Sequence, residues 1–366
     1  MISVLLAPLL ALTPALPGEE IQLVSGKVLS VKKVTSETFT EVTYITTGGA
    51  EGRKPADRVQ EVVHNLGSAL LNDYVQGLEL MEEKGDYTLA IQTFNTVLAD
   101  SRLMKSRSLP WVRQHVRFRQ IRCMFSLADY ESVAATADML LQEVPDTFFY
   151  APALMMKAQA QELTGDRDGA AATFTQLKSD VTAKGLPERW AREAELGLLL
   201  LDKSLDGATK RARLQELVEK NRQDHPTVSS RANVEIGNSM VEGKNYARAR
   251  EFFQAIIDEG RADDQTMASA WAGLGDCAFQ QGLALETKKE SGPYFQEAIL
   301  AHLRVATLYR ENPILAPRSL CFAAQAYYRL ETAEGKSRGK KIVAVLVARF
   351  PNSPWTRRCK EILNLR

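Results

Sequence analysis

The sequence predicts a mainly α-helical protein, an α-solenoid of helix hairpins preceded by a small β meander or open barrel. From about residue 67 onward, small and large apolar residues recur at the spacing of packed helix pairs. Residues 20–64, which precede them, are rich in β-branched and aromatic residues that favour strands. The length of 366 residues exceeds what one compact core usually holds, so an elongated array with a small appendage is favoured.

The first seventeen residues carry no charged side chain and contain an apolar run over residues 4–12. This run is shorter than the ~20 residues of a bilayer-spanning helix, and prolines at positions 8, 14 and 17 oppose one continuous helix. It resembles a secretory signal peptide with cleavage after Ala15, although no Lys or Arg precedes the run. We therefore predict an exported protein of the periplasm or cell envelope, with residues 1–17 as a signal peptide or an apolar N-terminal segment.

Residues 20–64 form the predicted β module. Strands are expected over residues 21–24, 27–34 and 38–45, with turns at 25–26, 35–37 and 48–49. Residues 58–64 fit a fourth strand, although their apolar spacing also suits a helix. A sheet of this size is marginally stable alone, so we expect it to pack against the first helices.

Residues 67–366 form the predicted helical array of six to seven hairpins. In one hairpin, Gly237 has no Cβ and lets a second helix approach, and a turn at residues 243–246 follows. Ala249 and Phe253, four residues apart, then share one face of that second helix. A turn glycine, a small residue and a large residue recur in that order at Gly85, Ala90 and Phe94 and at Gly165, Ala170 and Phe174.

The first helix of one hairpin contains Trp271, Leu274, Gly275 and Ala278. This order of a Trp, Leu-Gly and a small residue resembles the tetratricopeptide repeat (TPR) family. The resemblance extends over residues 67–366 and implies a TPR-like α-solenoid, with loops longer than in the ~34-residue standard unit. The β module is similar to the strand-rich module that precedes the repeats of some exported bacterial proteins. In the sixth unit, residues 280–292 are expected to separate the helices, the second of which covers residues 294–309.

No group of side chains has the sequence spacing of a catalytic or metal site. None of the four cysteines belongs to a CxxC pair, and the four histidines share no metal-ligand spacing: His64, His115, His225 and His302. We therefore expect no catalysis, no cofactor and no metal. The cysteines within apolar helices fit small buried residues, and a disulfide stays open if the protein is exported.

The resemblance also implies a binding groove. In the TPR family the first helix of each unit lines a concave surface at its second, fifth, ninth and twelfth positions. Carried onto this sequence, these positions are His115, Phe118, Arg122 and Phe125 in the second unit, and Arg231, Val234, Asn238 and Val241 in the fifth. Arg231 and Asn238 resemble a clamp for a peptide carboxylate, but Val234 stands where that clamp has a Lys. The alternative is that these residues line an unoccupied surface.

A non-enzymatic scaffold is therefore the expected function, binding a protein or peptide segment in the groove, in a cell-envelope complex. Residues 102–122 contain seven Lys or Arg and no acid, but an exported protein rarely meets nucleic acid, so no nucleic-acid partner is expected. The alternative function is a structural adaptor at a membrane surface, anchored by an uncleaved N-terminus. Residues 336–366, with nine Lys or Arg and one acid, would then contact lipid peripherally, or they form a solvated cap. The sequence leaves the oligomeric state open.

Overall fold

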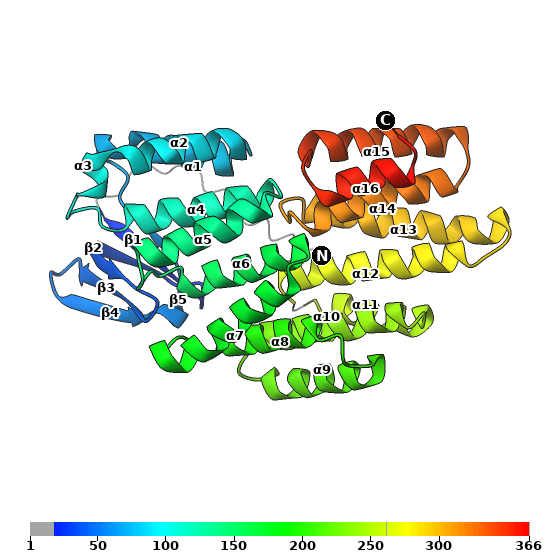
Figure 1. Ribbon diagram of the computed structural model, residues 1–366, viewed down its shortest axis with the longest axis horizontal. Helices are drawn as coiled ribbons and strands as arrows, with labels where there is room; N and C mark the ends of the chain where they lie inside the picture. The colour runs from blue at the N-terminus through cyan, green and yellow to red at the C-terminus, as the bar shows by residue number, and fades with distance from the viewer. Residues whose placement is uncertain (1–17, 261, 366) are drawn as a thin grey trace. The chain divides into compact units, whose positions relative to one another are not determined.

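A computed structural model describes residues 18–260 and 262–365. The segment of residues 1–17, and with it the predicted signal peptide or anchor, lies outside the described residues. Helices make up most of the described chain, and a small antiparallel sheet precedes them (Figure 1). The predicted fold class, a helical-hairpin array after a β meander, is confirmed.

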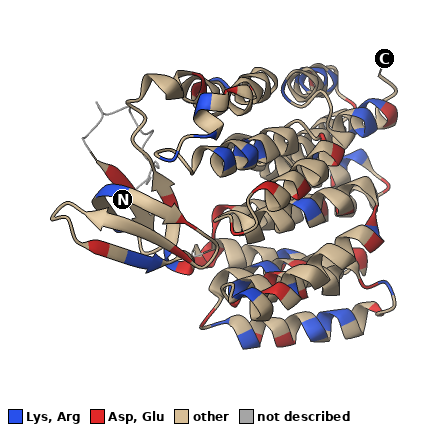
Figure 2. Cartoon of the chain, turned by 60° about the vertical axis from the view of Figure 1, so that its left-hand side comes forward, with Lys and Arg blue, Asp and Glu red and all other residues tan. Residues whose placement is uncertain are grey.

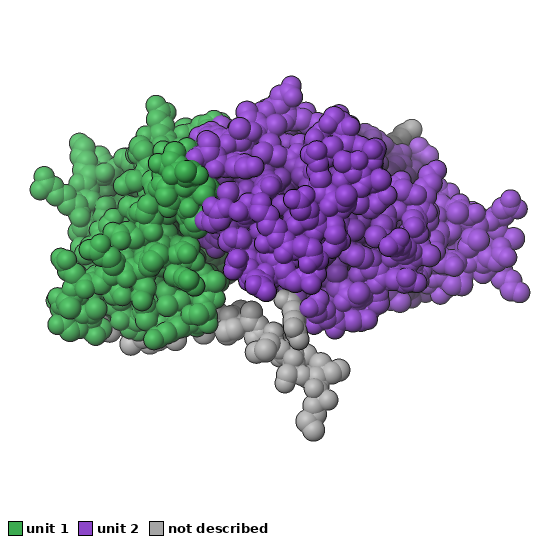
Figure 3. Space-filling view, turned by 90° about the horizontal axis from the view of Figure 1, so that it is seen from below, with its two compact units in different colours: residues 1–123, 134–156, 180–187 green, residues 124–133, 157–179, 188–366 purple. Residues whose placement is uncertain are grey.

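The chain divides into two compact units (Figure 3). Unit 1 comprises Met1–Cys123, Ala134–Met156 and Asp180–Pro187, and unit 2 comprises Met124–Val133, Lys157–Ser179 and Glu188–Arg366. Four helices contribute residues to both units: α4 (Val112–Ser126), α5 (Tyr130–Glu143), α6 (Tyr150–Thr164) and α7 (Arg167–Lys184). Unit 1 therefore combines the sheet with helical segments, as expected for a sheet too small to be stable alone.

The sheet of unit 1 has five antiparallel strands in the order β4-β3-β2-β1-β5. The strands are β1 (Glu19–Leu23), β2 (Val28–Glu37), β3 (Glu41–Thr46), β4 (Glu51–Pro55) and β5 (Val59–Val63). The first four form a meander, and β5 returns to pair with β1. One face buries an apolar core made of Ile21, Val31, Val34, Val42, Val59 and Val62.

Two details of the predicted β module are wrong. The expected turn at residues 35–37 is the end of β2, where Ser36 pairs with Thr43 and Glu37 with Val42. Turn-forming residues are tolerated there because the ladder with β3 holds them extended, and the chain turns at residues 38–40 instead. Strand β4 was not predicted, because it is an edge strand that contains no large apolar residue. Residues 59–63, for which strand and helix were both open, form β5.

The first helices of unit 1 are α1 (Asn72–Glu82), α2 (Tyr87–Ala99) and the short α3 (Ser101–Met104). Gly85 has a φ of +64° in the turn between α1 and α2, and the Asp86 carboxylate accepts the Leu89 N–H and caps α2. Ala90 and Phe94 are fully buried between the two helices. Trp111 and Val116 continue the same core.

Unit 2 holds the later hairpins. Its helices are α8 (Arg189–Leu201), α9 (Gly207–Asn221), α10 (Pro226–Glu242), α11 (Tyr246–Glu259), α12 (Asp264–Leu283), α13 (Lys288–Leu308), α14 (Leu315–Arg329), α15 (Ala333–Arg349) and α16 (Pro354–Ile362). Helix α10 contacts both α8 and α12, and α12 contacts α14 (Figure 1). The first helices of four successive hairpins therefore form a continuous row.

Close approach between these helices depends on residues without a Cβ. The Phe253 ring of α11 is fully buried against Gly237 of α10 and Gly273 of α12. A Cβ on Gly237 would lie 2.5 Å from the Phe253 ring, and one on Gly275 would lie 2.6 Å from the His302 ring of α13. Around these contacts, Ala249, Leu274 and Ala278 are buried and Trp271 is half-buried.

The sixth hairpin departs from the sequence prediction. Helix α12 runs on to Leu283 and α13 begins at Lys288, so residues 280–292 do not separate the helices as expected. Pro293 is tolerated because it lies near the start of α13, where its missing N–H removes a single hydrogen bond. In unit 2, Gly165 follows the end of α6 with a φ of +88°, and Ala170 and Phe174 of α7 are buried.

No helix among the described residues has the length and apolar character to cross a membrane.

Candidate functional site

The predicted groove residues of α4 fall into different environments. Phe118 is half-buried and its ring stacks on Phe149, with centroids 4.3 Å apart, while Arg122 is exposed. Phe125 is buried and contacts the edge of the Tyr130 ring, so its placement on an open groove is wrong. His115 is buried as well, and its Nε2 donates to the Glu37 carboxylate at 2.8 Å. The placement of His115 on an open groove is therefore wrong, because its ring is enclosed between α4 and the sheet.

The predicted groove residues of α10 are also partly engaged within unit 2. The Arg231 guanidinium forms an ion pair with Glu193 of α8. Asn238 donates to Glu235 at 3.1 Å. Val234 is buried in a core cluster, so its placement on an open groove is also wrong, while Val241 is half-buried beside it. Whether the exposed parts of this set contact a partner stays a prediction.

Ion pairs join successive first helices of unit 2. Glu193 of α8 pairs with Arg231 of α10, and Asp276 of α12 pairs with Arg318 of α14. Burial raises the pKa of both carboxyl groups, and the neighbouring guanidinium offsets that effect in part. The Arg318 guanidinium also lies 4.8 Å from the centre of the Phe322 ring. Half-buried arginine and aromatic side chains therefore line the row.

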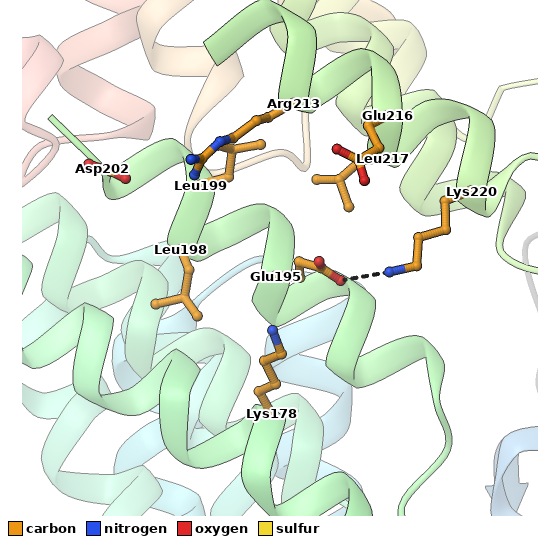
Figure 4. Close-up of a pocket in the computed structure, with 9 residues that line it drawn as sticks. All are labelled: Lys178, Glu195, Leu198, Leu199, Asp202, Arg213, Glu216, Leu217 and Lys220. Carbon is orange, nitrogen blue, oxygen red and sulfur yellow. Dashed lines mark ion pairs between the residues drawn. The ribbon is translucent and has the colours of Figure 1, made fainter. Parts of the chain in front are cut away.

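A surface hollow of about 280 Å³ lies among α7, α8 and α9 (Figure 4). It is lined by Lys178, Glu195, Leu198, Leu199, Asp202, Arg213, Glu216, Leu217 and Lys220. Three cationic and three anionic side chains share this lining, and the Lys220 ammonium lies 3.9 Å from the Glu195 carboxylate. With both signs of charge balanced, the hollow favours neither an anionic nor a cationic ligand. Positive and negative residues are interspersed over the helices in the same way (Figure 2).

A buried polar group in unit 1, here called the Glu–His cluster, consists of Glu19, Glu37, His64 and His115. Glu19 begins β1, Glu37 ends β2, His64 follows β5 and His115 lies on α4. The His64 Nδ1 is 3.1 Å from Glu19 Oε1, and its Nε2 bonds to Glu37 Oε1. All four residues are buried, and none is more than 8% exposed. The cluster therefore joins three strands to the first turn of α4.

The surroundings shift the pKa values of the two histidines in opposite directions. Burial acts to raise the pKa of Glu37, but the charge and hydrogen bonds of His115 and His64 outweigh it and lower that pKa to about 2. Burial acts to lower the pKa of His64, but its bonds to Glu19 and Glu37 outweigh it and raise that pKa. For His115, burial lowers the pKa and the contact with Glu37 offsets this only in part. Burial also acts to raise the pKa of Glu19, but its bonds to His64 and to the Val34 N–H outweigh it and lower that pKa. Both carboxylates are thus ionised near neutral pH.

Sequence spacing gave no indication of this cluster. Its members are far apart along the chain and share no metal-ligand motif, which is why no metal-ligating set was expected. The strand register brings them together, because the pairing of Glu20 with Val63 puts Glu19 opposite His64. One atom each of Glu37, His64 and His115 lies within 4.8 Å of the others, a grouping able to hold a metal ion.

Comparison with known families identifies one repeat within the helical array. Residues 152–181, in α6 and α7, match the family model of the tetratricopeptide repeat. No curated protein matches the chain. Among solved structures, the chain is similar to a Signal Transduction ATPase with Numerous Domains protein with a tetratricopeptide repeat sensor from Pyrococcus horikoshii. The identity is 12% and the TM-score 0.42, and the match covers 82% of this chain and 45% of that one.

Two further solved structures are similar at lower TM-scores. The C-terminal part of a TPR repeat-containing protein from Cytophaga hutchinsonii has 12% identity and a TM-score of 0.34, covering 78% of this chain and 98% of that one. Yeast Tom70 has 13% identity and a TM-score of 0.24, covering 81% and 72%. This chain spans less than half the length of the Pyrococcus protein, and none of these similarities is high enough to transfer an activity or a partner to it.

Proposed function

We propose that the chain is a non-enzymatic scaffold that binds an extended or helical segment of a partner protein, as the match of residues 152–181 to the tetratricopeptide repeat suggests. Repeats of this kind generally serve as interaction modules rather than catalysts. In unit 2 the proposed binding surface is the row of first helices α8, α10, α12 and α14. In unit 1, the exposed Arg122 of α4 is proposed to contact a partner as well. The function rests on this surface and not on a reactive group.

The observation that carries the proposal is the continuous row formed by α8, α10, α12 and α14. A row of parallel helices presents side chains at regular intervals, which suits an elongated ligand that touches several repeats. The row carries half-buried aromatic and arginine side chains, including Trp271, Phe322 and Arg318. Residues of these types commonly supply most of the binding energy of protein interfaces.

Photo-crosslinking at single positions tests this surface. A photoreactive residue placed at Arg122 of α4 or at Asn238 of α10 is expected to form adducts with the bound partner. The control position is Ala255 on α11, which is exposed but lies on a second helix. Adducts at Ala255 equal to those at Asn238 would show that partners do not prefer the first helices.

We further propose that the protein is exported and acts in the periplasm or cell envelope, as its apolar N-terminus suggests. Mass spectrometry of the protein from its native host is expected to find a chain that begins near Leu16. The alternative is an adaptor held at a membrane surface, which the exposed basic residues of α15 and α16 favour. A chain that retains Met1 and fractionates with membranes would support that alternative and contradict release.

A further inference from the structure

The Glu–His cluster has more negative charge than its own hydrogen bonds compensate. Glu19 and Glu37 are both buried carboxylates, and each accepts a hydrogen bond from the His64 ring. To donate to both, His64 must carry two protons and one positive charge. His115 donates to Glu37 through a single N–H. The cluster by itself then holds two negative charges and one positive charge in an enclosed site. Arg119, a further cation on α4, donates to the Tyr74 hydroxyl and pairs with Glu61 and Glu82 instead. Buried charge without a counter-charge is costly.

A divalent cation resolves this imbalance. When it replaces the Nε2 proton of His64, that histidine becomes neutral and still donates its Nδ1–H to Glu19. His115 changes to the tautomer that carries its proton on Nδ1, so its Nε2 atom offers a lone pair, and Glu37 offers its carboxylate. Two negative charges are then balanced by two positive ones.

We propose that Glu37, His64 and His115 bind a divalent transition-metal ion, Zn²⁺ by preference, with Glu19 as the outer partner of His64. This site does not depend on the proposed scaffold function. Imidazole nitrogen and carboxylate oxygen are the donors that zinc commonly takes, at about 2.0–2.2 Å. The three donor atoms lie within 4.8 Å of one another, so small side-chain rotations bring them to such distances from a common centre.

Glu19 occupies the position of the outer carboxylate found beside metal-binding histidines, which an ordinary buried ion pair does not need. Histidines that bind metals usually donate their second ring N–H to a carboxylate, which fixes the tautomer and the orientation of the ring. Glu19 has that position, 3.1 Å from His64 Nδ1, and its other oxygen accepts the Val34 N–H of β2. The ring is therefore oriented before any ion arrives, with its Nε2 directed at Glu37.

The surroundings indicate a structural ion rather than a catalytic one. The Trp111 ring stacks on His64 at 4.0 Å between centroids, and the Phe149 ring contacts His115 edge-on at 5.0 Å. Both histidines and Glu37 have nearly inaccessible side chains. An ion at this place would join β1, β2 and β5 to α4 and hold the sheet on the first helices of unit 1.

Metal binding by the full chain tests the proposal. The protein is prepared without a histidine tag, stripped with a chelator, and titrated with Zn²⁺ in competition with a chromophoric chelator. We expect one Zn²⁺ per chain and a rise in the melting temperature of the loaded protein, because an ion that binds the folded state stabilises it. With Co²⁺ as the probe, the absorption spectrum is expected to report nitrogen and oxygen donors.

Substitutions locate the ion. Glu37→Gln and His115→Gln are expected to abolish stoichiometric binding, whereas Glu19→Gln is expected to weaken it about 10–100-fold, as for an outer partner. His225→Gln is the matched control, since that histidine lies in unit 2 and outside the cluster, and it is expected to bind Zn²⁺ like the original chain. If Glu37→Gln unfolds unit 1, two measurements still test the site. These are the Co²⁺ spectrum of the unaltered chain and the Zn²⁺ affinity of Glu19→Gln.

Two results would overturn the proposal. One is a chain that binds less than one equivalent of Zn²⁺ or Co²⁺ after chelator treatment, which would leave the cluster as a network of ion pairs. The other is unchanged binding in Glu37→Gln and His115→Gln, which would place the ion elsewhere in the protein.

Discussion

At the scale of single residues, the hairpins of unit 2 depend on positions where a side chain is absent. Gly237 faces the Phe253 ring, and Gly243 of the same hairpin has a negative φ and no neighbour closer to its missing Cβ than 3.4 Å. The two glycines therefore serve different purposes. One permits close packing, and the other merely occupies a turn.

Alanine at these two positions should have opposite effects. Gly237→Ala is expected to lower the free energy of unfolding by about 1–3 kcal/mol, because the added methyl group would overlap the buried Phe253 ring. Gly243→Ala is expected to raise it by up to about 1 kcal/mol, because alanine restricts the unfolded chain without strain in the folded one. Urea unfolding of both variants measures the difference. Equal stabilities would mean that α11 does not need a glycine opposite Phe253.

His302 of α13 is a second residue whose environment predicts a measurable effect. Its ring is fully buried, its Nε2 lies 3.6 Å from Asp276 Oδ1, and Arg318 is the nearby cation. Burial lowers the pKa of His302 well below 6.5, and the positive charge of Arg318 lowers it further. The folded state therefore holds His302 neutral at pH values where the unfolded chain already binds a proton.

Acid is expected to destabilise the protein through this group. Between the folded pKa of His302 and about 6.5 the unfolded state holds more protons, so stability falls as the pH falls, by at most about 1.4 kcal/mol per pH unit. The difference in unfolding free energy between the original chain and His302→Leu, measured from pH 7 to pH 5, isolates this effect from the other titrating groups. A difference that stays constant over this range would show that His302 does not titrate in this way.

At the scale of secondary-structure elements, local sequence predicts most of what the structure contains. A hairpin needs a turn and a small residue opposite a large one, and these lie within about forty residues of each other, as at Gly237, Ala249 and Phe253. Edge strand β4 escaped prediction because it has no buried face to leave an apolar pattern. The Glu–His cluster escaped because its members meet only through strand register.

The ion pair between α8 and α10 gives a prediction at this scale. Arg231→Met leaves the Glu193 carboxylate, only 11% exposed, without its partner, and is expected to cost about 1–3 kcal/mol. Adding Glu193→Gln should recover part of that loss, so a double-mutant cycle is expected to give a coupling of about 0.5–3 kcal/mol.

An exposed pair on α9 provides the control for that cycle. Arg222 and Glu219 lie 2.7 Å apart but are more than half exposed, and Arg222→Met is expected to change stability by less than about 1 kcal/mol. A coupling between Arg231 and Glu193 no larger than that of the exposed pair would mean that the row of first helices is held by packing alone.

At the scale of the whole molecule, buried polar contacts join the sheet to the helices within unit 1, although each has its own apolar core. Gln114 of α4 accepts the Thr147 hydroxyl at 2.7 Å and donates to the main-chain carbonyl of Glu37, and Thr38 pairs with Thr147 as an isolated bridge. The sequence-based division into a β module and a helical array therefore separates two parts that lie in one compact unit. Repeat proteins need such caps, because a terminal hairpin otherwise exposes its apolar face.

Deletion of residues 18–66 is expected to destabilise the first hairpins and leave the later ones intact. Without the sheet, Trp111 and His115 lose the surface that buries them, so amide protons of α1, α2 and α4 should exchange faster. The amides of α12 and α13, whose contacts lie within unit 2, serve as the internal control and should keep their protection. Hydrogen exchange measured by mass spectrometry compares both regions in one sample. If α1 and α2 retained full protection after the deletion, the sheet would be an independent appendage and its polar contacts to α4 would contribute little to the stability of unit 1.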